Sequence, residues 1–216
     1  MSDQEKNLYH ITLLRHAESV GNARGYHQGQ AEFPLTDKGR QQASALADYW
    51  KNRQMLFDQI IASPQSRTQE TAEIIATALG MEIEYDPIWK ERDNGVYAGL
   101  NFEEAQELYP YPKFQPLYTR IGQKGESEWE LYLRGGQAIQ SILHRPAARY
   151  LIVSHGAILN MCLRSLLGIP AQANFQGARF RFRNTSFVSL TYQPATHRWT
   201  LFGINQRPHW DVEQDS

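Results

Sequence analysis

The sequence predicts an α/β fold in which a mostly parallel central sheet lies between two layers of helices, with one irregular lid insertion. Three short runs, at 8–14, 59–62 and 150–154, have apolar residues at consecutive rather than alternating positions. That pattern is typical of strands buried on both faces, as in parallel sheets covered by helices. Segments with helical apolar spacing separate the runs, which favours a three-layer sandwich.

Four helices are expected between and after these strands. Thr36 is placed to cap the first of them. Ser63 is placed to cap the second, with Pro64 at its first position and Gly80 at its end. The four helices are expected at 36–53, 64–79, 128–143 and 157–167.

Three regions differ from this pattern. The tail at 185–204 is expected to form two strands joined by a turn around Pro194. Before it, the alternation of arginine and phenylalanine at 179–183 predicts a half-buried strand with a basic outer face, or an edge for a partner. The segment 101–127 is rich in proline and tyrosine and is expected to be the lid insertion, because long irregular loops often serve binding.

Composition narrows the class of protein. With 216 residues the chain is expected to form one domain, 1–216, that carries the lid. A net charge of -1 argues against nucleic-acid binding, and we see no membrane span and no secretory signal. The single cysteine, Cys162, lies in a helical run and is expected to be a packed thiol. A cytoplasmic location is therefore expected.

Polar side chains follow the apolar strands at the points where the strands end. Arg15 and His16 follow the first strand, Arg67 lies just after the second, and His155 follows the strand at 150–153. Ligands of open α/β sheets bind beyond the carboxyl ends of the strands, so these side chains should meet at one place. Two arginines, two histidines and helix N-termini facing one point would suit a compact dianion such as a phosphoryl group.

Backbone groups at the fourth helix extend this site. The amides of Gly156 and Ala157 are expected to add neutral donors, and Gly156 lets the chain come close to a ligand. The histidines lack the i, i+4 spacing of a helical zinc site, so neither a metal nor another cofactor is predicted.

Several motifs in fixed order resemble those of the histidine phosphatase superfamily, which has the phosphoglycerate-mutase-like fold. The opening motif is "LLRHAESVGNARGYHQG", with glycine of the family pattern replaced by Ala17. In "GVYAG", Ala98 stands where many phosphatases of the family have glutamate. The other motifs, which cover nearly the whole chain, are "PLTDKGRQQA", "IIASPQSRTQETA", "KERDNGVYAGLNFEE", "GES", "IVSHGAIL" and "RNTSFVSL".

The resemblance implies a role for each matching residue. His16 would attack phosphorus and form a phosphohistidine, while Arg15, Arg67 and His155 would balance the charge of the phosphoryl oxygens. Glu91 would give a proton to the leaving oxygen and later take one from water. Two further side chains would add hydrogen bonds to the phosphate; these are Asn22 and Gln28.

Three functions are compatible with these residues. The first is a metal-independent phosphatase acting on a small phosphorylated metabolite. The second is a phosphoglycerate mutase, but the adjacent arginine pair that grips the substrate carboxylate in mutases is absent from 101–127, which offers Lys113, Arg120 and Lys124. The third is a non-catalytic scaffold that binds phosphorylated ligands, although this chain keeps both nucleophile and acid. The phosphatase is favoured, its substrate stays open, and an exposed strand edge makes a homodimer reasonable.

Overall fold

The computed structural model describes residues 7–210, which contain a six-stranded sheet with the order β3-β2-β4-β1-β5-β6. Strands β1 to β4 are parallel to one another, whereas β5 runs antiparallel to both β1 and β6. This is the mostly parallel sheet expected from the consecutive apolar runs. The strands are β1 Tyr9–Arg15, β2 Gln59–Ala62, β3 Ile83–Tyr85, β4 Arg149–Ser154, β5 Phe187–Gln193 and β6 Arg198–Gln206.

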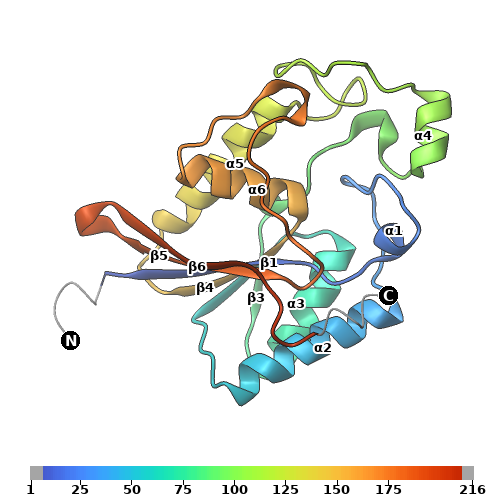
Figure 1. The fold of residues 1–216 in the computed structure, drawn as a ribbon. Coiled ribbons are helices and arrows are strands. Elements are labelled where there is room, and N and C mark those ends of the chain that lie inside the picture. The colour runs from blue at the N-terminus through green and yellow to red at the C-terminus, as the bar shows by residue number, and fades with distance from the viewer. Residues whose placement is uncertain (1–6, 211–216) are drawn as a thin grey trace.

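Helices cover both faces of this sheet, as expected (Figure 1). Helices α5 and α6 pack on one face, and α2 and α3 pack on the other. The short helices α1 and α4 lie together at the end of the sheet from which the lid extends. The α-helices are α1 Val20–Ala23, α2 Asp37–Asn52, α3 Ser66–Leu79, α4 Phe102–Leu108, α5 Glu128–Leu143 and α6 Gly156–Leu166. Within the described residues, none of the helices has both the length and the apolar character needed to span a bilayer.

The register of the central strands brings the ends of β1 and β4 together. Arg15 lies opposite Ser154 in the parallel β1–β4 pair, and the His16 amide donates to the Ser154 carbonyl at 2.9 Å. His16 and His155 therefore leave neighbouring strands at the same edge of the sheet. Buried apolar side chains of both strands pack against a helical layer on each face of the sheet.

The second helix begins later than the sequence analysis expects, so Ser63 and Pro64 are not its cap and first residue. The cap position of α3 is Gln65, whose side chain makes no capping hydrogen bond. Ser63 is engaged elsewhere, because its hydroxyl lies 2.9 Å from His155 Nε2. At the other end Gly80 has φ of 67° and closes the helix as expected.

The expectation of a strand at 179–183 is wrong. These residues form no ladder, since their backbone groups bond to side chains of the body. The Phe180 amide and carbonyl pair with the side chain of Asn160, and Arg15 donates to the Phe182 carbonyl. The basic alternation thus belongs to an irregular strap that crosses the α6 face.

Close approach of α5 and α6 depends on a glycine. A β-carbon at Gly135 would lie 2.8 Å from Met161 backbone and side-chain carbons, so the two helices could not keep their spacing. At the next position, Gly136, a β-carbon would meet only the end of the Ser165 side chain at 2.8 Å, which can rotate away. The N-terminus of α6 is thereby placed against the sheet edge.

This contact predicts different effects for two neighbouring glycines. Gly135→Ala should lower the free energy of unfolding by about 1–3 kcal/mol, because a methyl group is forced into a packed interface. Gly136→Ala should leave it unchanged or raise it by up to about 1 kcal/mol, because alanine favours the helix. Urea denaturation of both variants measures the difference. Equal effects would show that the helix contact does not require glycine at 135.

Candidate active site

A cavity of about 150 Å³ opens beyond the carboxyl ends of the central strands. Its walls come from segments far apart in the chain: the end of β1, the loop after α1, the start of α3, the segment after β3, and the start of α6. Among the described residues, its lining consists of Arg15, His16, Tyr26, His27, Gln28, Gly29, Arg67, Glu91, Arg92, Asn94 and Ala157. The position agrees with the general rule for open α/β sheets.

His16 is held as a neutral imidazole in one tautomer. It is 2% exposed, and its Nδ1 lies 2.7 Å from the carbonyl oxygen of Ala17, so Nδ1 carries the hydrogen and donates it. Burial, followed by the charges of Arg67 and Arg15, holds the pKa of His16 well below its ordinary value. Nε2 is left with a lone pair, which is the state that a nucleophilic imidazole requires.

Both backbone polar groups of Ala17, its amide and its carbonyl, support this arrangement. Its amide donates to the Thr71 hydroxyl at 3.1 Å, while its carbonyl accepts from His16. The alanine methyl group is fully buried with Leu35 and Ala43. Ala17, one of the two departures from the family pattern, is therefore packed in an apolar pocket rather than facing the cavity.

Arg67 is a buried cation held by three acceptors. Its guanidinium donates to the carbonyls of Ala31 at 3.0 Å and Gly29 at 2.8 Å, and its Nε donates to His155 Nδ1 at 3.2 Å. Burial lowers the pKa of Arg67 to about 10, against the opposing charge of Glu91. The side chain therefore stays positively charged at neutral pH.

Arg15 is the second cation of the site and is less completely bonded. One of its terminal nitrogens donates to the Phe182 carbonyl at 2.7 Å. Its Nε is buried and lacks a hydrogen-bond partner among the described residues. Burial lowers the pKa of Arg15 and the charge of Glu91 opposes that effect. Two guanidinium groups thus bring positive charge to one small cavity, which suits a phosphoryl dianion.

His155 lies behind the cavity wall and bonds to the groups around it. Since Nδ1 accepts from Arg67, Nε2 carries the hydrogen and donates to the Ser63 hydroxyl. The ring packs edge-on against His16, with 5.2 Å between ring centroids. Burial, then the Arg67 charge, holds its pKa well below the ordinary value. In this structure His155 orients Arg67; the direct phosphate contact expected from the sequence stays a prediction.

The carboxylate of Glu91 lies at the N-terminus of α6. Both carboxylate oxygens accept from the Ala157 amide at 3.2 Å, and one also accepts from the Ile158 amide at 3.2 Å. The Arg92 amide donates to the same oxygen at 2.9 Å. The Ala157 amide expected to bind phosphate therefore bonds to Glu91 in this structure, and Gly156 forms the first residue of α6 beside Arg15. Helix N-termini favour such a negative group.

Asn22 and Gln28 form a polar network on α1 and the loop that follows it. The Asn22 side-chain oxygen accepts from the Ser19 amide and from the Asn184 side chain. The Gln28 oxygen accepts from the Ser19 hydroxyl at 2.6 Å. Gln28 lines the cavity, whereas Asn22 stands just behind it. Asn184 also donates to the His16 carbonyl at 3.0 Å, a contact that the sequence analysis missed.

Five further cavity residues were not identified from the sequence: Tyr26, His27, Gly29, Arg92 and Asn94. His27 adjoins Gln28 in "YHQG", but no local sequence pattern marks it as a site residue. Its ring contacts Phe102 and Tyr111 of the lid, with centroids 4.6 Å and 5.7 Å away. The adjacency of Arg92 to Glu91 was the one available signal for that residue. Lid aromatics thus pack against the rim of the cavity.

The two site histidines predict an acid-sensitive fold. Their pKa values are lower in the folded protein than the ordinary 6.5, so the unfolded chain takes up protons first as the pH falls. Their contribution is complete above pH 6.5 and is lost below it, at up to about 1.4 kcal/mol per pH unit for each group. Urea unfolding should therefore show a shallower pH slope for His155→Gln than for the wild type. Parallel slopes between neutral pH and pH 5 would contradict the buried neutral state.

Comparison with known proteins identifies relatives over most of the chain. The model of the histidine phosphatase superfamily (branch 1) matches residues 11–205. The probable phosphoglycerate mutase GpmB of Escherichia fergusonii is 37% identical over 207 residues, which cover 94% of this chain and 90% of that protein. GpmB of Yersinia enterocolitica is 35% identical over 209 residues, covering 94% and 95%.

Solved structures show the same fold. The alpha-ribazole phosphatase of Shigella flexneri has a TM-score of 0.78 at 23% identity, covering 92% of this chain and 96% of that one. A mycobacterial glucosyl-3-phosphoglycerate phosphatase has a TM-score of 0.75 at 23% identity, covering 91% and 99%. The extent of the family match and the identity to GpmB show that this chain belongs to the histidine phosphatase superfamily, branch 1.

Proposed function

We propose that this protein is a phosphatase that moves the phosphoryl group of a small phosphomonoester first to His16 and then to water. The observation that carries the proposal is the state of His16, which is neutral, donates from Nδ1 to Ala17, and lies in a cavity with two arginines. Arg15 and Arg67 are placed to bind the phosphoryl oxygens and to stabilise charge in the transition state.

The first chemical step forms a phosphohistidine. Nε2 of His16 attacks phosphorus, a P–N bond forms, and the P–O bond to the leaving group breaks. The Glu91 carboxylate, which accepts backbone amides in the structure, must take up a proton before this step; it gives that proton to the leaving alkoxide, which departs as an alcohol. The Nδ1 hydrogen bond to Ala17 stabilises the positive charge that develops on the imidazole ring.

The second step restores the enzyme. A water molecule attacks the phosphohistidine while the Glu91 carboxylate takes one of its protons, and the P–N bond breaks. His16 is released neutral, inorganic phosphate leaves, and Glu91 is again protonated. The positive charge needed in both steps comes from arginine side chains, so the scheme uses no metal.

The competing proposal is a phosphoglycerate mutase, which the names of the GpmB relatives favour. In that reaction a phosphoglycerate rather than water accepts the phosphoryl group. Against it, none of the three lid cations, Lys113, Arg120 and Lys124, lines the cavity among the described residues. Arg120 pairs instead with Glu130 on the exposed side of α5. Release of inorganic phosphate from phosphoglycerate, without isomerisation, would support the phosphatase.

Removal of the nucleophile should abolish hydrolysis. With a chelator present, the wild type should release phosphate from p-nitrophenyl phosphate, and His16→Ala should be slower by at least about 10³-fold in kcat. Exposed His144→Ala serves as the control and should retain full activity. An active His16→Ala would exclude the histidine mechanism, and a wild type that is inert without metal would exclude the proposed metal-free phosphatase.

Loss of the proton donor should depend on the leaving group. Glu91→Gln should slow hydrolysis of a primary alkyl phosphate by about 10²–10⁴-fold, since an alkoxide cannot leave unprotonated. Hydrolysis of p-nitrophenyl phosphate should fall much less in the phosphorylation step, because p-nitrophenolate is a stable anion. Single-turnover rates for the two esters measure that step directly. Equal losses on both esters would assign Glu91 another role.

A further inference from the structure

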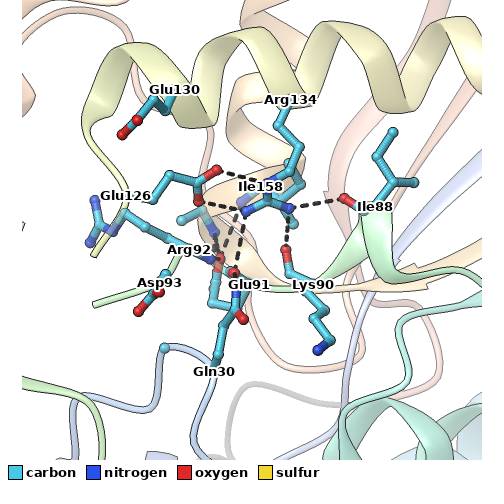
Figure 2. A network of polar contacts seen from close by, with 12 residues as sticks. Gln30, Ile88, Lys90, Glu91, Arg92, Asp93, Glu126, Glu130, Arg134 and Ile158 are labelled. Atoms are coloured by element: carbon cyan, nitrogen blue, oxygen red, sulfur yellow. Dashed lines mark hydrogen bonds and ion pairs between the residues drawn. The ribbon is translucent and has the colours of Figure 1, made fainter. Parts of the chain in front are cut away.

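Arg134 on α5 reaches the segment that carries Glu91, and the proposed mechanism does not use it. We propose that Arg134, oriented by Glu126, is a positioning residue that fixes Glu91 for proton transfer. The inference rests on the proposed function, because it takes Glu91 to be the proton donor. Figure 2 shows the guanidinium of Arg134 at the centre of this network.

The guanidinium bonds to three backbone carbonyls in succession. One terminal nitrogen donates to the Ile88 carbonyl at 2.9 Å and the Lys90 carbonyl at 2.6 Å. The other donates to the carbonyl of Glu91 itself at 3.3 Å (Figure 2). A single side chain therefore fixes the path of the backbone up to the residue that carries the carboxylate.

Glu126 holds the guanidinium in the orientation that these contacts need. Its two oxygens accept from Nε of Arg134 at 2.8 Å and from a terminal nitrogen at 2.7 Å, in a two-point pair. The side chains are only 18% and 14% exposed, so water competes weakly with the pair. The Glu126 amide also donates to the Asp93 carbonyl at 2.8 Å, which ties this residue to the same loop.

The loop needs such external support because it has no regular structure. Short 3-10 turns at Pro87–Trp89 and Gly95–Tyr97 flank it, and residues 90–94 lie in neither helix nor strand. Buried carbonyls outside helices and strands must find other donors. Arg134 supplies them for Lys90 and Glu91.

Contacts from the opposite side complete the fixation of Glu91. Its amide donates to the side-chain oxygen of Gln65 at 2.8 Å, and its carbonyl also accepts from Gln30 at 3.1 Å. With its backbone held on both sides, the carboxylate lies at the N-terminus of α6 beside the cavity. Lysine at 134 would keep the charge but lose the planar fork that reaches these acceptors together.

The inference predicts a leaving-group effect rather than a general loss. In single turnovers, Arg134→Lys should slow phosphoryl transfer from a primary alkyl phosphate by about 10–100-fold, part of what general acid catalysis contributes. The rate with p-nitrophenyl phosphate should fall less than about threefold, because that step needs no proton donor. The ratio of the two rates does not depend on the fraction of enzyme that is folded. A purely structural role would lower both rates equally, and that result would overturn the inference.

Three further proteins make the test decisive. Arg120→Lys alters an exposed arginine–glutamate pair near the same helix and should leave the ratio unchanged. Glu126→Gln should shift the ratio as Arg134→Lys does, which covers the case in which the lysine variant fails to fold. In a Glu91→Gln background, Arg134→Lys should add little further loss, since both changes remove one function. Additive losses would overturn the inference, whereas a wild type inert on both esters would instead refute the proposed function.

Discussion

Burial of positive charge at the end of the central sheet is the constraint on which the rest of the site depends. Arg67 is 1% exposed, and a guanidinium in that position must find acceptors to replace water. The carbonyls of Gly29 and Ala31 supply them, so the loop after α1 is drawn over the cavity. Burial, together with the same positive charges, lowers the pKa of His16 and keeps it neutral. The binding of a phosphoryl dianion and the neutral state of the nucleophile His16 therefore both depend on buried positive charge.

A second consequence is that loops rather than strands carry most of the site. The strap at 179–183 makes no strand pairing, and its Phe182 carbonyl accepts a hydrogen bond from Arg15. The carbonyls of Lys90 and Glu91 accept hydrogen bonds from Arg134. These bonds hold the backbone of Glu91 so that its carboxylate lies at the N-terminus of α6. His16 follows a strand of the central sheet, whereas the loops around it are held by hydrogen bonds to arginine side chains.

Much of this arrangement could be predicted from local patterns. Consecutive apolar runs located β1, β2 and β4, and the rule for strand ends brought His16 and Arg67 together. Burial of Cys162, with its thiol pKa raised to about 12, confirms the packed thiol. The misplaced cap at Ser63 has a physical reason, because a distant histidine bonds to that hydroxyl. Long-range contacts of this kind, like that of Arg134 with Glu91, have no local sequence signal.

The most direct test of the account is to locate the phosphoryl group during turnover. The wild type would be mixed with a phosphomonoester, stopped within milliseconds in alkali, digested and analysed by mass spectrometry. We predict a phosphoryl group on His16, bonded to Nε2, because Nδ1 is committed to the Ala17 carbonyl. Hydrolysis with no phosphorylated residue, or with the phosphoryl group on another side chain, would contradict the account.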